Sequence, residues 1–261
     1  MKTLFTVLLG IACLTLLFFG NLHWQEKIER AGAATVNKTQ DIEKEISDEN
    51  YTKEQTLRYA MNWTEKEKQS LQTAFAEDRP YHILIAGSML LGQGDTSWPS
   101  LFKKELTDAY GENVITVVTK SYSNTTEEFV KSGKQQEFID ESADLIIWEP
   151  FILTDNSVVD IEDSLDNILT VINDVKAKNS NTIFILQPPS PVYHPKLYKR
   201  QVEALNAFAK EHQIPFLNHW TNWPDPSSEE VLTYLYSGTS TPNEEGHRVW
   251  AEFLIDRFIS N

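Results

Sequence analysis

The sequence predicts an α/β fold, in which a five-stranded parallel sheet is covered by helices on both faces. From Tyr81 onward, short segments that are apolar throughout alternate with longer amphipathic segments. Strands of this kind are buried on both faces, and the helices between them provide the crossovers that parallel strands require. Because such crossovers are right-handed, we expect a three-layer α/β/α domain.

The apolar and amphipathic segments assign each element in chain order. We expect strands over residues 82–86, 114–118, 145–148, 182–186 and 215–217. We expect helices over residues 98–110, 125–139, 161–178, 195–212 and 242–259. In open sheets of this type, chemistry gathers at the carboxyl ends of the strands, so the loops that follow the strands are the places to look for a site.

Composition excludes several classes of function. The chain has 261 residues, 41% of them hydrophobic, which is enough for one full core and an appendage. Its formal net charge of −15 argues against a nucleic-acid partner, because that binding needs clustered Lys and Arg. The one cysteine, Cys13, lies in the apolar leader. We therefore predict no disulfide, no thiolate metal site and no thiol nucleophile in the folded part. No metal or organic cofactor is implied.

The start of the chain is typical of an exported protein. An apolar run from Leu4 to Phe19 extends to Leu22 if its polar tail is counted, and ~17–20 apolar residues suffice to span a bilayer. A cleaved signal peptide would need a small-residue site soon after the run, whereas Ala31 to Ala33 lie more than ten residues past Phe19. We expect residues 1–22 to be an uncleaved signal-anchor that leaves the rest of the chain outside the cytoplasm. If the leader is cleaved instead, the rest of the chain is secreted.

Residues 23–79 are polar and are expected to form a stalk followed by a helix. Thr64 and Glu67 have the spacing of a capping box, which predicts a helix from there to about Ala76. A coiled-coil partner surface is the alternative, although no heptad pattern is sustained. The expected organisation is thus an anchor over 1–22, a stalk and helix over 23–79, and the α/β domain over 80–261.

A serine follows the first predicted strand. Ser88 leaves the strand for a loop that contains Gly92 and Gly94. A serine in this position can expose its hydroxyl over the edge of the sheet, as a nucleophile requires. The loop lacks the G-x-S-x-G pattern of α/β-hydrolases and the Lys and Ser/Thr of a phosphate-binding loop. A serine that caps a short helix in a turn is the structural alternative.

Two segments resemble the SGNH/GDSL hydrolases. The stretch from Ala86 to Gly94, AGSMLLGQG, is similar to the family's first block, G-D-S-L-x-x-G-x-G, with Ser88 at the nucleophile. The stretch from Pro242 to His247, PNEEGH, is similar to a P-N-x-x-G-H segment near the end of many members. The resemblance covers residues 81–259 and implies a flavodoxin-like strand order and an esterase activity.

The general base expected from the resemblance is missing. The family's D-x-x-H motif would fall on Gly238 to Thr241, which contain neither Asp nor His. His247 is the nearest imidazole and the predicted base, although its counterpart is structural in most members. His219, at the end of the last predicted strand, is a second candidate, and a domain without a base is the third possibility, because serine needs one.

The oxyanion donors that the resemblance implies are the backbone amides of Ser88 and Ser121 and the side chain of Asn156. Ser121 stands where the family's second block has Gly, and Asn156 would have to reach in from a lengthened loop after the third strand. Glu149, at the end of that strand, is a carboxylate that could act as acid, base or substrate contact, or pair with a cation at the rim.

Aromatic residues near the expected site suit either a sugar-binding cleft or a core. They are Trp98, Trp148, Tyr193, Trp220 and Trp223. The function expected is a membrane-anchored serine esterase that removes acyl groups from an ester-bearing small molecule or a cell-envelope polysaccharide. The alternative is a catalytically degenerate domain that binds an envelope glycan or a protein partner.

Overall fold

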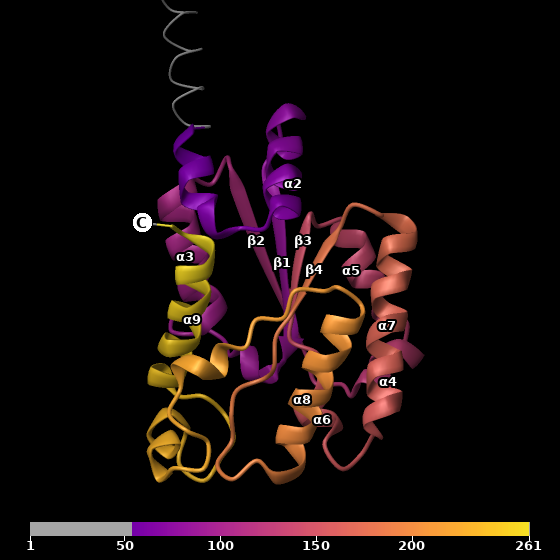
Figure 1. The fold of residues 1–261 in the computed structure, drawn as a ribbon, viewed down its shortest axis with the longest axis vertical. Coiled ribbons are helices and arrows are strands. Elements are labelled where there is room, and N and C mark those ends of the chain that lie inside the picture. The colour runs from indigo at the N-terminus through magenta and orange to yellow at the C-terminus, as the bar shows by residue number, and fades with distance from the viewer. Residues whose placement is uncertain (1–53, 261) are drawn as a thin grey trace, which may run out of the picture. The chain divides into compact units, whose positions relative to one another are not determined.

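The computed structural model describes residues 54–260, which fold around a parallel β-sheet (Figure 1). The sheet has four strands in the order β2-β1-β3-β4. Their bounds are β1 Tyr81–Ser88, β2 Ile115–Tyr122, β3 Leu145–Trp148 and β4 Ile183–Leu186. The α/β class and the parallel sheet predicted from the sequence are confirmed.

The fifth predicted strand is reduced to a single bridge. Phe216 pairs in parallel with Leu186 at the free edge of β4, with hydrogen bonds from Leu186 N to Pro215 O and from Leu217 N to Leu186 O. Pro215 has no N–H to donate, so the ladder cannot extend through it. The sheet therefore has four strands rather than five, although the edge segment lies where the flavodoxin-like order places it.

Helices connect the strands and cover both faces of the sheet. They are η1 Ala60–Asn62, α2 Glu65–Ala76, η2 Met89–Leu91, α3 Trp98–Tyr110, α4 Thr126–Lys131, α5 Gln136–Glu141, α6 Ile152–Asp155, α7 Ile161–Lys178, α8 Lys196–Glu211, η3 His219–Asn222, η4 Glu229–Tyr234 and α9 Glu244–Phe258. The helix predicted over 125–139 is two helices, α4 and α5. Gly133 lies between them with a φ of 70°, a left-handed conformation that ends a helix.

Each face of the sheet has its own apolar core. On one face, Ile83 and Ile85 of β1 pack in a cluster with Phe102 of α3 and Trp250 of α9. On the other, Leu84 belongs to a cluster with residues of α4, α5, α7 and α8. Figure 1 shows α3 and α9 on one side of the strands and α7 and α8 on the other. Successive residues of β1 thus point into opposite cores, as a doubly covered strand requires.

The segment before β1 is attached to the last helix of the domain. The predicted capping box is confirmed, since Thr64 N donates to Glu67 Oε2 at 2.7 Å and Glu67 N donates to Thr64 Oγ1. Glu67 is fully buried and pairs with Arg257 of α9 at 2.7 Å. Trp63 donates to the carbonyl of Phe258 at 2.8 Å. Capping, ion pairing and burial therefore join residues 63–67 to the end of α9.

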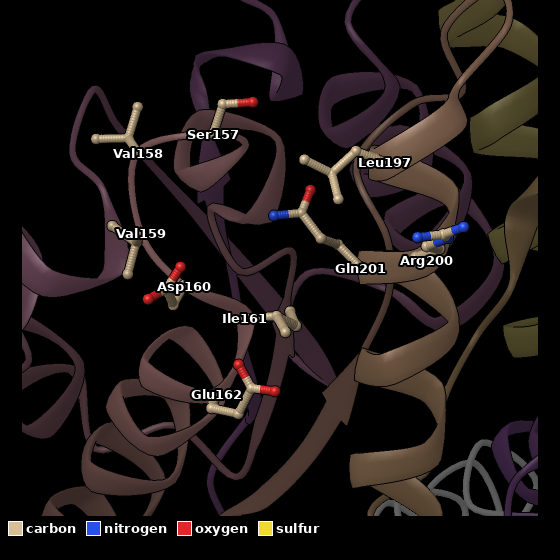
Figure 2. A pocket seen from close by; sticks show the side chains of 9 residues that line it. All are labelled: Ser157, Val158, Val159, Asp160, Ile161, Glu162, Leu197, Arg200 and Gln201. Carbon is tan, nitrogen blue, oxygen red and sulfur yellow. The ribbon is translucent and has the colours of Figure 1, made fainter.

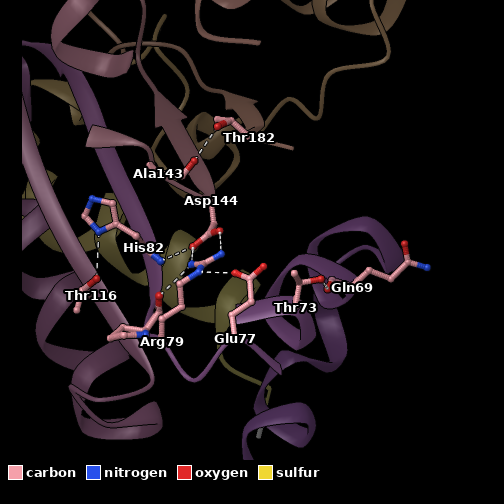
Figure 3. Close-up of polar contacts among 10 residues, drawn as sticks. Gln69, Thr73, Glu77, Arg79, His82, Thr116, Ala143, Asp144 and Thr182 are labelled. Carbon is pink, nitrogen blue, oxygen red and sulfur yellow. Dashed lines mark hydrogen bonds and ion pairs between the residues drawn. The ribbon is translucent and has the colours of Figure 1, made fainter. Parts of the chain in front are cut away.

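The amino ends of the strands carry a network of paired polar groups (Figure 3). Asp144 accepts two hydrogen bonds from Arg79 at 2.7 and 2.8 Å and a third from the backbone N–H of His82. Thr182 donates to the carbonyl of Ala143. This edge is opposite to the one that holds Ser88.

The predicted membrane anchor, residues 1–22, lies outside the described residues. Between residues 54 and 260, no helix combines the length and the hydrophobicity needed to cross a bilayer.

The buried ion pair between α2 and α9 gives a test of the packing. Substituting Arg257 by Met leaves the Glu67 carboxylate buried without its cation, so we expect the free energy of unfolding to fall by about 3–5 kcal/mol. Arg248→Met on the same helix is the control, because Arg248 is half exposed and its pairs with Glu245 and Glu252 are on the surface; it should cost under about 1 kcal/mol. Urea unfolding of the full chain measures both, and equal losses would contradict a structural role for the buried pair.

Candidate active site

Ser88 lies at the carboxyl edge of the sheet, as the last residue of β1. It pairs in register with Tyr122, the last residue of β2. The hydroxyl accepts a hydrogen bond from Leu90 N at 3.2 Å and so caps the short helix η2. Gly92 ends that helix with a φ of 76°, a conformation that favours glycine. Ser88 is 3% exposed, so its hydroxyl faces the interior of the edge rather than open solvent.

The group that contacts the Ser88 hydroxyl is a carboxyl. Glu149 directly follows β3, and its backbone N–H continues the ladder by donating to Ala86 O at 2.8 Å. Its Oε2 accepts hydrogen bonds from both Ser88 Oγ and Ser88 N, each at 2.7 Å. Glu149 is fully buried. Burial raises its pKa to about 8, although the two hydrogen bonds from Ser88 favour the charged form.

The contact depends on a glycine next to the serine. A Cβ added to Gly87 would lie 2.8 Å from Glu149 Oε2 and 2.9 Å from Glu149 Cβ. Gly87 stands where the SGNH/GDSL motif has Asp. A side chain at this position would displace the carboxyl that reaches Ser88.

His247, the predicted base, lies near the same loop but is not hydrogen bonded to Ser88. It is in the first turn of α9, which Asn243 caps by accepting from Gly246 N at 3.1 Å. A Cβ on Gly92 would come within 2.6 Å of two ring atoms of His247, so the imidazole packs on the Gly92 backbone. Its Nδ1 is buried without a partner among the described residues. Burial lowers its pKa to about 4, which leaves the ring neutral at neutral pH.

Both ring nitrogens of His219, the second candidate base, are occupied by contacts within the core. Its Nε2 lies 2.9 Å from Pro188 O, and its Nδ1 accepts from Trp223 Nε1 at 3.0 Å. The ring stacks on Trp250 with 4.0 Å between centroids. Burial lowers its pKa to about 3. These contacts fix one neutral tautomer and leave no nitrogen free to accept a proton from a serine.

The predicted oxyanion residues occupy different surroundings from Ser88. Ser121 is a residue of β2 itself, in register with Gly87, rather than part of a turn after the strand. Asn156 ends α6, and its Oδ1 is buried without a partner in the described chain. No hydrogen bond joins either residue to Ser88 within residues 54–260. Their roles stay predictions.

Gln187 is a candidate site residue that the sequence analysis did not name. It directly follows β4, and its N–H donates to Trp148 O at 3.0 Å, which places it beside Glu149 in the sheet register. Gln187 is fully buried, and its Oε1 accepts from Trp250 Nε1 at 3.0 Å. Its Nε2 and Glu149 Oε1 are both buried without partners in the described residues. The signal was a polar residue ending an apolar strand, the same signal that marks Glu149.

The predicted aromatic cluster is mostly core. Trp98 and Trp148 are buried in the two apolar clusters, and Trp98 stacks on Trp250 with 5.0 Å between centroids. Trp223 is 6% exposed and bonded to His219. These rings stabilise the domain and cannot form a flat sugar-binding surface, so the core alternative is the correct one for them.

Comparison with known proteins identifies the fold. No protein-family model matches the sequence, and no curated protein matches it either. Several solved structures match in fold, all at low identity. One from Desulfitobacterium hafniense, described as lipolytic and of the G-D-S-L family, is 21% identical with a TM-score of 0.57, covering 68% of this chain and 99% of that chain. A GDSL-like lipase from Parabacteroides merdae is 11% identical with a TM-score of 0.59, covering 69% and 96%.

A third match is an acetyl-xylooligosaccharide esterase from Geobacillus. It is 14% identical with a TM-score of 0.52, and the alignment covers 69% of this chain and 94% of that one. These matches agree with the two motifs and with the strand order of the sheet. The chain therefore has the fold of the GDSL-type lipases and esterases.

Proposed function

We propose that the domain is a serine esterase of the SGNH/GDSL type, with Ser88 as nucleophile and Glu149 as its general base. The observation that carries this proposal is the 2.7 Å hydrogen bond from Ser88 Oγ to Glu149 Oε2. It joins a hydroxyl at the end of β1 to a buried carboxyl at the end of β3. A nucleophile and a base within hydrogen-bond reach are what acyl transfer requires.

In the proposed reaction, ionised Glu149 takes the proton of Ser88 as the oxygen attacks the ester carbonyl. The tetrahedral intermediate collapses when Glu149 returns that proton to the leaving alkoxide, which departs as an alcohol and leaves an acyl-serine. Water then attacks the acyl carbon as Glu149 accepts its proton. The bond between the acyl carbon and Ser88 Oγ breaks as Glu149 returns that proton to Ser88 Oγ, which releases the carboxylic acid and restores the serine hydroxyl. A base with a pKa near 8 is well matched to this double role, because it both accepts and returns a proton near neutral pH.

We prefer Glu149 to His247 as the base for two reasons, its direct contact with Ser88 and its higher pKa. The carboxyl touches the nucleophile, whereas the imidazole packs on Gly92. A base with a pKa of about 4 has less affinity for the serine proton than one with a pKa of about 8. His247 would have to move toward Ser88 to act, and its unpartnered Nδ1 keeps this a testable alternative.

The oxyanion needs N–H donors directed at the developing charge. Ser88 N–H lies at the nucleophile and would exchange its bond to Glu149 for one to the substrate oxygen. We assign the second donor to Gln187 Nε2, which is buried, unpaired in the described residues and held by Trp250 through its own Oε1. Ser121 and Asn156 remain the alternatives predicted from the family resemblance.

The proposed substrate is an O-acyl ester on a cell-envelope glycan, cleaved outside the cytoplasm by a membrane-anchored enzyme. The apolar run at residues 4–19 supports export, and the absence of Cys after Cys13 is compatible with it. The structural likeness to an acetyl-xylooligosaccharide esterase supports an acyl group on a sugar. If the leader is cleaved, the same domain is secreted.

A domain that binds without cleaving is the second candidate function. Ser88 is 3% exposed, and both its N–H and its hydroxyl are already bonded to Glu149. In this alternative, the contact is a structural bridge between two strand ends, and the domain binds an envelope glycan or a protein partner.

A fluorophosphonate probe separates the two functions. We expect the full chain to be labelled, Ser88→Ala to lose all labelling, and Glu149→Gln to label at least ~10²-fold more slowly, since general-base catalysis contributes that much. Ser164→Ala is the matched control, because Ser164 is a buried serine that also donates to a carboxylate at 2.7 Å, that of Asp155. Labelling that survives in Ser88→Ala would rule out Ser88, and an unlabelled wild type would favour the binding domain.

The pH dependence of hydrolysis identifies the base. If Glu149 acts as base, kcat/KM for p-nitrophenyl acetate rises as the pH rises through about 8, because the carboxylate is the active form. If His247 acts, the rise occurs near pH 4 and the rate is flat from pH 6 to 10. We expect His247→Ala to keep the midpoint near 8. Rates are corrected with Ser88→Ala, and a flat profile above pH 6 would contradict the role of Glu149.

The same carboxyl should make stability depend on pH. Its pKa rises from 4.5 to about 8 on folding, so wild type loses stability as the pH rises between these values. Glu149→Gln removes that loss and should exceed wild type by about 3–5 kcal/mol at pH 9, at ~1.4 kcal/mol per pKa unit. Glu141→Gln is the control, and it should be less stable than wild type at pH 9, because hydrogen bonding to Lys120 lowers the pKa of Glu141. Denaturant unfolding at pH 5 and pH 9 measures the free energy of unfolding of both proteins. If the difference between wild type and Glu149→Gln is the same at the two pH values, folding does not raise the pKa of Glu149.

A further inference from the structure

A cavity of about 340 Å³ opens between the loop after α6 and the first turns of α8 (Figure 2). Its lining comes from residues 157–162 on one side and from Leu197, Arg200 and Gln201 on the other. Ser157 holds a left-handed backbone with a φ of 67°, an uncommon conformation for serine and one that is often found at ligand sites. The volume lies at the lower end of the range for small-molecule sites.

The cavity lies toward the same edge of the sheet as Ser88. Helix α6 begins at Ile152, close behind Glu149, and α8 follows the loop that leaves β4. Tyr198 lies on α8 between two lining residues, Leu197 and Gln201. Its hydroxyl donates to the carbonyl of Ser190 at 3.1 Å, which joins α8 to the loop that follows β4 at this edge.

Gln201 supplies a buried polar group that has no partner in the described chain. The residue is 4% exposed, and its Oε1 makes no hydrogen bond within residues 54–260. In Figure 2, its amide points into the space between the two walls. A buried carbonyl oxygen without a donor costs free energy, and a ligand hydroxyl would remove that cost.

The remaining lining indicates which ligands fit. Asp160, Glu162 and Arg200 are exposed and have no ion-pair partner among the described residues. Two carboxylates against one guanidinium, on a chain of net charge −15, disfavour an anionic ligand. An acyl chain would leave Gln201 unpaired. Exposed Val158 and Leu197 add apolar contact at the rim, which suits the C–H face of a sugar.

We propose that this cavity binds a neutral sugar unit of the acylated substrate, with Gln201 accepting a hydrogen bond from a sugar hydroxyl. The assignment rests on the proposed esterase function and narrows it, since it selects a neutral glycan over a charged one. Asp160 and Glu162 accept from further hydroxyls, and Arg200 donates to ring or hydroxyl oxygens.

The experiment compares two esters on the full chain. For an acetylated xylo-oligosaccharide, we expect Gln201→Met to raise KM about tenfold with kcat unchanged, which is the effect of losing one hydrogen bond of ordinary strength. Leu197→Ala, at an exposed rim position that tolerates change, should raise the same KM severalfold. For p-nitrophenyl acetate, which has no sugar, neither variant should differ from wild type. Gln135→Met is the matched control, because Gln135 also has a buried, unpartnered Oε1 but lies away from the cavity.

The outcomes separate the two proposals. If wild type cleaves both esters and neither Gln201→Met nor Leu197→Ala changes KM for the oligosaccharide, the sugar site is wrong and the esterase stands. If wild type cleaves neither ester, the esterase is wrong, and calorimetry with the unacetylated xylo-oligosaccharide tests the cavity directly. Binding that weakens about tenfold in Gln201→Met would then support the sugar site, and no binding by wild type would overturn it.

Discussion

The hydrogen bonds between Glu149 and Ser88 are the contact on which the candidate site depends. They connect the carboxyl ends of two adjacent strands where the backbone ladder stops, and they place a buried carboxyl against a hydroxyl. The absence of a side chain at Gly87 makes this approach possible. Burial at this position raises the pKa of Glu149 to about 8, well above that of a solvent-exposed carboxyl. The contact between Glu149 and Ser88 and the raised pKa of Glu149 therefore both depend on the pairing of β1 with β3 and on the glycine at position 87.

Helix α9 organises the other side of the site. It presents His247 to the loop of Ser88 and, one turn later, Trp250 to Gln187. Its far end is held by the buried pair between Arg257 and Glu67. The same helix therefore contacts both the segment before β1 and the residues around Ser88.

The fold could be predicted from the sequence because its signals are local. Apolar strands such as Leu145–Trp148 and amphipathic helices such as Ile161–Lys178 have bounds that the structure reproduces. Ser88 was placed correctly at a strand end for the same reason. The partner of Ser88 was not predictable in this way, since Glu149 is 61 positions away and meets it through the pairing of β1 with β3. The family motifs predict a histidine as the base. The contacts that His219 and His247 make depend on tertiary packing, which cannot be derived from the spacing of residues in the sequence.

The chemistry of a carboxyl base explains how the site could function without the family's D-x-x-H. An imidazole in water is basic near neutrality, whereas a carboxyl becomes so only after desolvation. Glu149 is fully buried, while His247, buried against Gly92, has its pKa driven down to about 4. Burial therefore exchanges the usual order of the two groups, making the carboxyl the stronger base. If Ser88 is the nucleophile, as we propose, burial of this edge of the sheet favours Glu149 and disfavours His247 as its base by the same physical cause.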